Sequence, residues 1–315
     1  MLKVKLYFAP LEGITTYTYR NVHNRMFGMC DEYYAPFISP TENEKLSTKN
    51  MRDILPQNNS VNLKVQCLAN NEVAFVDFTE RVSALGYNEV NLNLGCPSGT
   101  VVKKNKGSGM LRDLERLDEF LGYIFKKSSA EISIKTRTGF YSHEEFESIL
   151  RIFEKYPIKE LIIHPRVREE YYKTSVSLAS FERAYMTSKL PLCFNGDVCG
   201  VQDFEKIIDR FPCINSVMIG RGALKNPAIF RELRGGGRLT SEELVMFSKE
   251  LEKAYLPILG SEIYTLHKLK EIWMYAIENY TTEKKICKAI KKSSKLSDLN
   301  GTIESLPELP RVTHE

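Results

Sequence analysis

The hydrophobic residues of this chain fall into short apolar runs separated by longer stretches with a helical period. Eight such runs precede residue 220, at 4–9, 33–38, 62–67, 89–93, 131–136, 161–164, 190–195 and 216–219. Amphipathic segments lie between most of them, as in 71–85, 115–125, 144–156, 201–211 and 223–233. Strands that alternate with helices predict a parallel sheet. Eight units within roughly 235 residues favour an α/β fold of the (β/α)8 TIM-barrel type, and only this count argues against an open doubly wound sheet.

The pattern changes at a triple glycine, Gly235-Gly236-Gly237. Glycine runs are typical of linkers. Beyond them the hydrophobic period is helical, in 241–256, 261–280 and 282–295, and the segment Thr240 to Glu243 has the composition of a helix start. We therefore expect a barrel domain over residues 1–235, followed by a small C-terminal helical domain over residues 236–315.

Polar residues and glycines follow nearly every predicted strand. In chain order they are Pro10 to Gly13, Gln66, Asn93 to Pro97, Lys135 and Arg137, His164 and Arg166, Asn195 to Asp197, and Gly220 with Arg221. The carboxyl ends of barrel strands meet at one rim, where active sites are built. The sequence therefore predicts an active site assembled from these residues.

Composition and charge narrow the classes of protein to which this chain can belong. The chain has 315 residues, 43% hydrophobic and 27% charged, which is ordinary for a folded protein. A net charge of +4 is too small to indicate a nucleic-acid partner, so local clusters must carry that argument. The N-terminus lacks the apolar core of a signal peptide, and no apolar run approaches the ~20 residues of a membrane span. We expect a soluble, cytoplasmic protein; the sequence leaves its oligomeric state open, with a monomer favoured.

The seven cysteines are odd in number and include no C-x-x-C pair, which argues against a disulfide framework or a structural metal site. Cys67, Cys193 and Cys213 lie beside apolar runs, and we expect them to be buried. Cys96 differs because it lies between Gly95 and Pro97, which fixes its backbone. An aimed thiol suits catalysis, although a small buried hydrophobe in a turn explains the residue equally well.

The turns after the last two predicted strands are rich in small residues. Asn195-Gly196-Asp197 and Gly220-Arg221-Gly222 let a ligand approach the backbone, and these two loops form the usual phosphate site of such barrels. Ordinary turns are the alternative. Gln66, Lys135 and His164 close apolar strands and need partners. A flavin ring would provide them, whereas a buried salt bridge for Lys135 and a satisfied core histidine for His164 are the plainer explanations.

Six motifs together resemble the FMN-dependent tRNA-dihydrouridine synthase family. They are Ala9-Pro10-Leu11-Glu12-Gly13-Ile14-Thr15, Asn93-Leu94-Gly95-Cys96-Pro97, Lys135-Thr136-Arg137-Thr138-Gly139, His164-Pro165-Arg166, Asn195-Gly196-Asp197 and Met218-Ile219-Gly220-Arg221-Gly222-Ala223. They occur in the family's order and spacing over the first ~230 residues. Leu11-Glu12 replaces the Met-Ala or Met-Glu of many members, and Pro165 replaces a common glycine. Neither change removes a catalytic group.

The resemblance implies an FMN barrel that uses NADPH or NADH to reduce the C5–C6 double bond of a D-loop uridine in tRNA. It implies that Cys96 donates a proton to C5. It also implies that the flavin contacts Pro10, Leu11, Glu12, Gln66, Lys135, His164, Asn195, Gly196, Asp197, Gly220 and Arg221. No metal is implied.

Further residues are candidates for holding the RNA. Asn93 and Arg137 could grip the extruded base, Arg166 begins a basic run, and Tyr171 and Tyr172 could stack. Phosphate contacts are expected from Lys103 and Lys104 and from a lysine-rich helix that includes Lys288 and Lys292. A solvated helix face is the alternative for those lysines. Two other functions remain open: a flavin barrel acting on a free pyrimidine, such as dihydroorotate, and a non-catalytic tRNA-binding protein.

Overall fold

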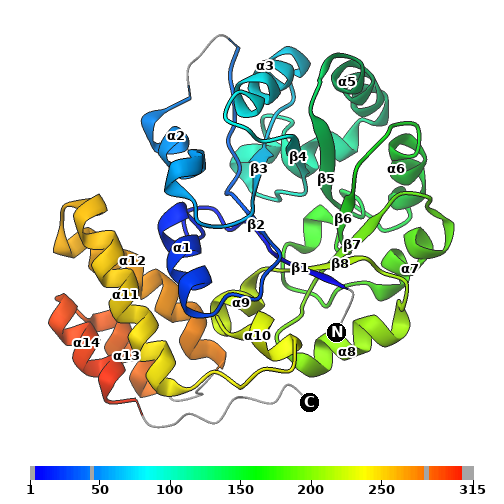
Figure 1. Cartoon of the computed structure of the whole chain (residues 1–315). Coiled ribbons are helices and arrows are strands. Elements are labelled where there is room, and N and C mark those ends of the chain that lie inside the picture. Colours follow the sequence, from blue (N-terminus) through cyan, green and yellow to red (C-terminus); the bar gives the residue numbers. More distant parts are fainter. Residues whose placement is uncertain (1–3, 43–45, 280–283, 307–315) are drawn as a thin grey trace.

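A closed parallel barrel forms the larger part of the molecule (Figure 1). The computed structural model describes residues 4–42, 46–279 and 284–306. Neighbouring strands pair in chain order, and β1 closes the barrel against β8 with Lys5 opposite Ser216. The strands are β1 Lys5–Phe8, β2 Glu32–Tyr34, β3 Leu63–Cys67, β4 Glu89–Leu94, β5 Glu131–Arg137, β6 Leu161–His164, β7 Leu192–Asn195 and β8 Ser216–Ile219. The predicted (β/α)8 fold is confirmed.

Helices surround the barrel, and the connections that contain them run from the carboxyl end of each strand to the amino end of the next (Figure 1). They are α1 Tyr17–Met26, α2 Thr48–Ile54, α3 Glu72–Ser83, α4 Gly99–Val102, α5 Leu114–Lys127, α6 Glu145–Phe153, α7 Leu178–Thr187, α8 Val201–Arg210, α9 Arg221–Lys225 and α10 Ile229–Leu233, with short 3-10 turns η1 Pro56–Asn58, η2 Gly107–Arg112 and η3 Arg168–Glu170. Side-chain caps start several of them. Asn71 accepts from the N–H of Ala74 in α3, and Asp113 from that of Arg116 in α5.

Two prolines explain where the elements differ from the sequence pattern. The run 33–38 forms a strand only as far as Tyr34, because Pro36 has no N–H for the sheet. The segment 223–233 is two helices rather than one. Asn226, which precedes Pro227, is extended at φ −129° and ψ 91° and separates α9 from α10.

The interior of the barrel is unusually polar. A small apolar cluster of Tyr7, Ala9, Tyr34, Ile162, Cys193 and Met218 lies apart from the main core. Buried polar side chains lie on the same inward-facing positions of the strands, among them Gln66, Asn91 and Ser133. The main core lies between the sheet and the helices. Cys67 and Cys193 are buried as predicted, but the prediction for Cys213 is wrong, because it lies in the turn after α8 and is exposed.

The C-terminal part is helical, as predicted, and packs directly on the barrel. It comprises α11 Ser241–Leu259, α12 Glu262–Ala276, η4 Ile277–Asn279, α13 Lys284–Lys292 and α14 Leu296–Glu304, of which the last was not predicted. Thr240 and Glu243 form a capping box at the start of α11. Phe247 of α11 packs edge-on against Tyr19 of α1, so one continuous core spans both parts. Of the residues predicted as helical, 280, 282 and 283 lie outside the described residues.

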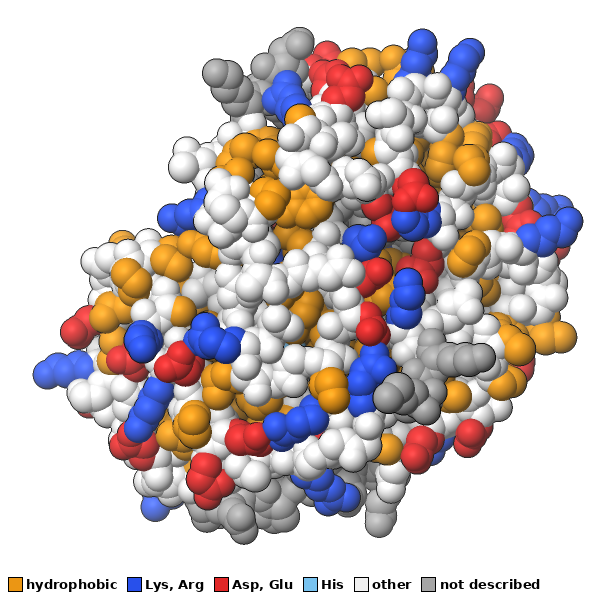
Figure 2. Space-filling view, viewed as in Figure 1, with side chains coloured by type: hydrophobic (Ala, Val, Ile, Leu, Met, Phe, Trp, Pro, Cys, Tyr) orange, Lys and Arg blue, Asp and Glu red, His pale blue; other side chains and the backbone are white. Residues whose placement is uncertain are grey.

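Charge is distributed evenly over the visible face of the molecule. Figure 2 shows lysine and arginine side chains interspersed with acidic ones over the barrel and the helical part. None of the helices in the described ranges is long and apolar enough to cross a membrane.

Candidate active site

A cavity of about 750 Å³ opens at the carboxyl ends of the strands. This volume is within the range of roughly 300–1,000 Å³ typical of cofactor and ligand sites. Nine of the eleven predicted cofactor residues line it, namely Pro10, Leu11, Lys135, His164, Asn195, Gly196, Asp197, Gly220 and Arg221. They come from the ends of β1, β5, β6, β7 and β8, so the barrel topology brings together residues more than 200 positions apart.

Asp197 ties three cavity residues together. Its carboxylate accepts hydrogen bonds from both terminal nitrogens of Arg166, one of them at 3.0 Å, and from Arg221 at 2.9 Å. Arg166 is buried, and its Nε also donates to the carbonyl of Thr174 at 2.9 Å. The guanidinium of Arg166 is therefore held within the wall of the cavity, where it fixes Asp197, while the guanidinium of Arg221 remains half-exposed.

Gly222 lets the loops after β7 and β8 lie against each other. A Cβ atom at this position would lie 2.0 Å from the carbonyl oxygen of Val198. No side chain fits there, so glycine is required for the approach of these two loops. Asn195 reinforces the contact, because its Nδ2 donates to the carbonyl of Met218 at 2.8 Å. The small-residue turns thus form one wall of the cavity, and their predicted contact with a phosphate stays a prediction.

Lys135 brings a positive charge into the cavity. Its side chain lines the cavity and makes no hydrogen bond or ion pair with any residue that the structure describes. Burial, followed by the nearby positive charge of Arg137, lowers the pKa of Lys135 to about 8. The alternative of a buried salt bridge does not apply to this arrangement. An ammonium group placed in this way favours a ligand that carries or gains negative charge.

His164 is neutral in this environment. Burial, together with the positive charges of Arg137, Lys135, Arg166 and Arg221, lowers its pKa well below the ordinary value. Nε2 of His164 lies 3.0 Å from a terminal nitrogen of Arg166. Because a guanidinium can only donate, Nε2 accepts and the proton of the neutral ring lies on Nδ1. His164 therefore offers one N–H donor.

A chain of buried amides supports the Gly95-Cys96 turn. Oδ1 of Asn93 accepts from the N–H groups of Gly95 at 3.0 Å and Cys96 at 2.9 Å. Nδ2 of Asn93 donates to Gln66, and Gln66 donates to Asn91, each at 2.8 Å. In the structure Gln66 and Asn93 thus hold the turn, and neither they nor Cys96 line the cavity described above. Their predicted contacts with ring and base remain predictions.

Arg137 supports the same turn from β5. It is fully buried, and it donates to the carbonyls of Gly95 at 3.0 Å, Val167 at 2.8 Å and Tyr171 at 2.8 Å. Its guanidinium therefore joins the cysteine turn to the loop after β6. Burial raises the pKa of the Cys96 thiol above its ordinary value, although Arg137 and Lys135 oppose that shift. A protonated thiol at neutral pH can act as an acid but is a poor nucleophile.

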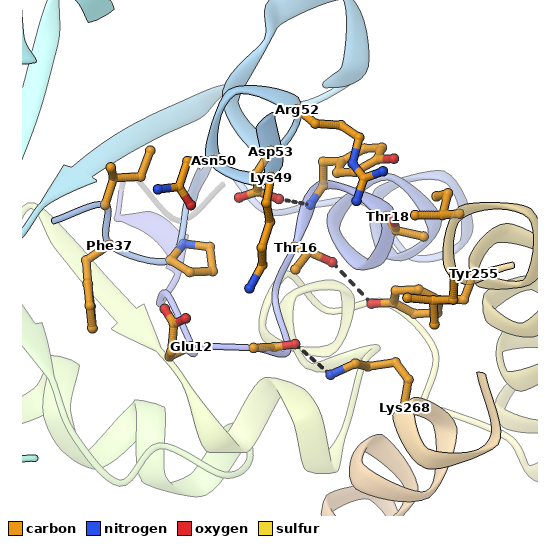
Figure 3. A pocket seen from close by; sticks show the side chains of 16 residues that line it. Glu12, Thr16, Thr18, Phe37, Lys49, Asn50, Arg52, Asp53, Tyr255 and Lys268 are labelled. Carbon is orange, nitrogen blue, oxygen red and sulfur yellow. Dashed lines mark hydrogen bonds between the residues drawn. The ribbon is translucent and has the colours of Figure 1, made fainter. Parts of the chain in front are cut away.

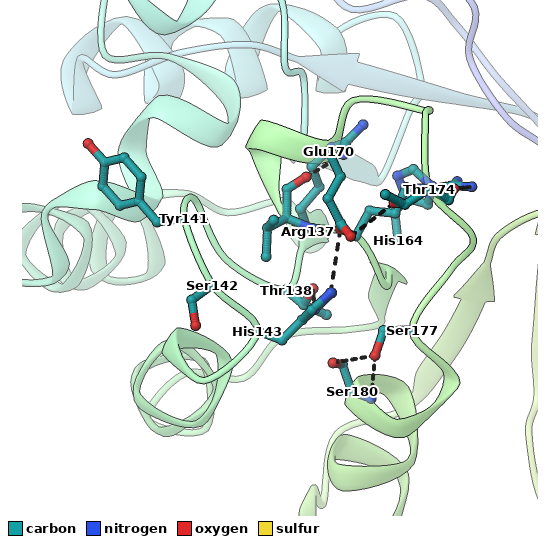
Figure 4. Close-up of polar contacts among 12 residues, drawn as sticks. Arg137, Thr138, Tyr141, Ser142, His143, His164, Glu170, Thr174, Ser177 and Ser180 are labelled. Atoms are coloured by element: carbon teal, nitrogen blue, oxygen red, sulfur yellow. Dashed lines mark hydrogen bonds and ion pairs between the residues drawn. The ribbon is translucent and has the colours of Figure 1, made fainter.

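The loop after β6 is fastened by a carboxylate at its start (Figure 4). Glu170 accepts from the N–H of Val167 at 2.8 Å and from the hydroxyl of Thr174 at 2.9 Å, and it lies 3.4 Å from Nε2 of His143. His143 is itself held by Thr138, with its Nδ1 2.8 Å from that hydroxyl. This network fixes the loop that carries Tyr172.

Tyr172 stands between two arginines at the mouth of the cavity. Its ring lies 4.5 Å from the guanidinium carbon of Arg221 and 5.3 Å from that of Arg137. The side chain is 51% exposed, so one part of the ring is free to contact a ligand. Sequence reasoning identified Tyr172 as a candidate but missed Lys173, Thr174 and Ser175, which also line the cavity. Their polar, small-residue composition after a strand was the available signal.

The remaining predicted residues lie around this centre. The carboxyl group of Glu12 borders a second cavity rather than the first. Lys103 and Lys104 are exposed beyond α4, near the cysteine turn. Lys288 and Lys292 are exposed on α13 and make no ion pair with a described residue. Among the residues that the structure describes, no group of acidic, cysteine or histidine side chains could hold a metal ion.

Comparison with known proteins agrees with this geometry. The family model described as dihydrouridine synthase matches residues 7–305. The tRNA-dihydrouridine synthase B of Pseudomonas aeruginosa is 24% identical over 231 residues, covering 73% of this chain and 68% of that protein. A probable tRNA-dihydrouridine synthase of Helicobacter pylori is 28% identical over 232 residues, covering 73% of this chain and 70% of that protein.

Two solved structures share the fold. A histamine dehydrogenase from Rhizobium sp. 4-9 superposes with a TM-score of 0.54 at 8% identity, covering 73% of this chain and 45% of that one. A variant of NCR from Zymomonas mobilis has a TM-score of 0.50 at 12% identity, covering 75% and 88%. At such low identity these likenesses bear on the barrel fold alone.

Proposed function

The chain belongs to the dihydrouridine synthase family, and from that premise we propose that it reduces a D-loop uridine of tRNA to 5,6-dihydrouridine with FMN and NADPH or NADH. The observation that carries the proposal is the unpaired ammonium of Lys135, which lies inside a cavity of about 750 Å³ at the mouth of the barrel. The curated relatives whose names specify tRNA support the choice of substrate.

The residues present fit FMN. Lys135 offers a positive charge to the part of the ring that gains electron density, and the Nδ1–H of His164 offers a donor. The turn of Gly220 and Arg221 and the turn of Gly196 and Asp197 present backbone and a cation to a phosphate. When bound and reduced, FMN supplies a hydride for C6 of the uracil.

The chain's own residues supply the matching proton. Cys96 is the group we assign as the acid that protonates C5, because its thiol is half-buried and its pKa is raised, so it carries its proton at neutral pH. Asn93 and Arg137 hold the turn on both sides and so keep the sulfur in one place. With FMN held by the cavity residues, the role of Cys96 would be to deliver the proton to C5 of the uracil.

The RNA reaches this site through the open rim. We assign the base contacts to Tyr172, which is exposed and flanked by two arginines, and to the neighbouring Tyr171. Lys103 and Lys104 beside the cysteine turn, and Lys288 and Lys292 on α13, are exposed and available for phosphates. We assign catalysis to the barrel and tRNA binding to the helical domain as part of the same proposal.

The test is a comparison of substrates with the purified protein. We expect it to bind FMN, to lose the flavin absorption band when NADPH is added, and to regain it on addition of unmodified tRNA. Free uracil and orotate, the oxidised partner of dihydroorotate, are the competing electron acceptors. If either of them restores the absorption band and tRNA does not, the chain acts on a free pyrimidine and the proposal is wrong.

A further inference from the structure

A second cavity, of about 260 Å³, lies beside the candidate active site (Figure 3). Its walls come from the loop after β1, from α2, and from α11 and α12. Leu11 lines the first cavity and Glu12 the second, so the two are adjacent along the chain. Burial raises the pKa of both Cys96 and Glu12; Glu12 is close enough to Cys96 to raise the pKa of that thiol further, and close enough to Lys49 for the ammonium to oppose the shift of its own pKa. The second cavity therefore adjoins the Cys96 side of the substrate site.

Some of its lining residues have structural partners. Lys268 donates to the carbonyl of Gly13 at 2.8 Å, and the hydroxyl of Tyr255 lies 3.3 Å from that of Thr16. Asp53 accepts a hydrogen bond from Arg20 at 3.2 Å. The first two contacts fix the helical part against the barrel, and the third holds α2 against α1.

Other lining residues make no side-chain hydrogen bond or ion pair with a described residue, although the charge of Lys49 acts on Glu12. Lys49 and Arg52 lie three positions apart on one face of α2, and neither side chain makes a hydrogen bond or ion pair with a described residue. In Figure 3 the Lys49 ammonium extends into the open space toward Glu12. These two cations give the cavity a positively charged border and make no hydrogen bond or ion pair with a described residue.

Phe37 adds an aromatic surface. It is half-buried, and it belongs to neither of the hydrophobic clusters formed by the described residues. An apolar ring that lines the same cavity as two cations fits a nucleotide, because a base can stack on the ring while its phosphate pairs with the cations. Glu12 supplies acceptors for the N–H groups of a base.

We propose that this cavity is a subsite for the nucleotide next to the target uridine in the RNA chain. Its base stacks on Phe37, and its phosphate pairs with Lys49 and Arg52. The inference rests on the proposed function, since extrusion of one base also unstacks its neighbour, which then needs a surface of its own. Stacking of this kind tolerates any base.

The test combines a protein variant with an RNA variant. Binding of full-length tRNA is measured for wild type and Phe37→Ala, using tRNA with an intact base or an abasic nucleotide on the 5′ or the 3′ side of the target. We expect Phe37→Ala to weaken binding of intact tRNA by roughly 5- to 150-fold. For one of the two abasic tRNAs, the same substitution should change binding very little, because the stacking partner is already gone.

The cations are tested separately. We expect Lys49→Ala with Arg52→Ala to reduce the slope of log affinity against log salt by roughly 0.7 for each phosphate that the variant no longer neutralises. Lys126→Ala with Lys127→Ala is the matched control. These exposed lysines end α5 just before β5 begins, at the opposite end of the barrel. The control removes equal charge and should leave the slope unchanged.

Three outcomes would overturn the subsite. Phe37→Ala could leave the affinity for intact tRNA unchanged, or it could weaken both abasic tRNAs by the same factor as intact tRNA. It could also raise the KM for NADPH without affecting tRNA binding, which would assign the cavity to the reductant. A wild-type protein that forms no dihydrouridine would instead refute the proposed function, and this is scored by an assay independent of the binding measurements.

Discussion

Replacing Gly107 by alanine should impair catalysis without removing any reacting group. Gly107 has φ +57°, in the left-handed region, and lies directly against the cysteine turn. A Cβ atom there would lie 2.9 Å from the carbonyl oxygen of Cys96, 3.0 Å from its Cβ and 3.0 Å from Val101. Ser108 meanwhile holds the same carbonyl through its N–H at 3.1 Å and its hydroxyl at 2.8 Å. The turn must therefore shift if Gly107 gains a methyl group.

Two terms set the size of the effect. The left-handed conformation costs a non-glycine residue about 1–2 kcal/mol, and the added methyl contributes a further overpacking cost of roughly 1–3 kcal/mol. The catalytic term is separate. Displacing the thiol by about 1 Å lowers the rate on the order of 10²-fold. We therefore expect Gly107→Ala to lose moderate stability and most of its activity while still binding flavin.

The assay is single-turnover formation of dihydrouridine, together with thermal unfolding. Gly28→Ala is the matched control, because Gly28 has the same φ of +57° but its added Cβ would meet only Asn24 O at an ordinary 3.5 Å. We expect Gly28→Ala to lose similar backbone stability and to retain its rate. A Gly107→Ala protein with the wild-type rate, or equal rate losses in both variants, would refute the reasoning.

Four further predictions follow from the same geometry. Cys96→Ala should retain flavin and tRNA binding but lose about 10²–10⁴-fold in dihydrouridine formation; full activity of the variant would exclude Cys96 as the acid. Because burial raises the pKa of the Cys96 thiol, wild-type activity should persist above neutral pH and fall only at alkaline pH. Lys135→Met should weaken flavin binding. The variant apoprotein should also be more stable than the wild type in thermal unfolding, and this advantage should shrink between pH 7 and 10. The reason is that the pKa of Lys135 is about 8 in the fold and higher in the unfolded chain, so the buried charge is costly only at lower pH. The stability of Glu160→Gln should equal that of the wild type at pH 5 and exceed it at pH 8. Burial raises the pKa of Glu160 to about 7, so the wild-type protein loses stability as the pH rises through that value and the buried carboxyl becomes charged. Equal stability of the two proteins at both pH values would contradict this. Replacing Lys288 and Lys292 by glutamine should weaken tRNA binding and lower its salt slope by roughly 1.4–1.8 if both contact phosphates, whereas an unchanged slope would mean that α13 faces solvent.

The strands of the fold were predictable because the physical signal is local. Apolar runs bounded by polar turns gave β6 and β8 their observed limits, and the other strands were placed within a few residues. The helix α1 was harder to recognise, since its buried face includes Arg20 and His23. Arg20 is buried because Asp53, thirty-three positions away, pairs with it. No periodicity in the sequence reports such a partner.

The candidate site was predictable as a set of positions but not as a set of contacts. Strand-end residues had to meet at one rim, and nine of the eleven predicted cofactor residues do line one cavity. Which polar groups face the ligand and which support the wall depends on tertiary pairing. Arg166 turned out to be held by Asp197, and Arg137 by three carbonyls, so both stabilise neighbouring loops in the structure. Only the folded chain distinguishes these roles.

Reduction of uridine in tRNA by this barrel can be tested in cells. The most direct measurement is mapping of dihydrouridine in tRNA from cells with the protein, from cells without it, and from cells that express Cys96→Ala. We expect dihydrouridine at one or more D-loop positions to disappear without the protein and not to be restored by the variant. An identical dihydrouridine map in the presence and absence of the protein would contradict it.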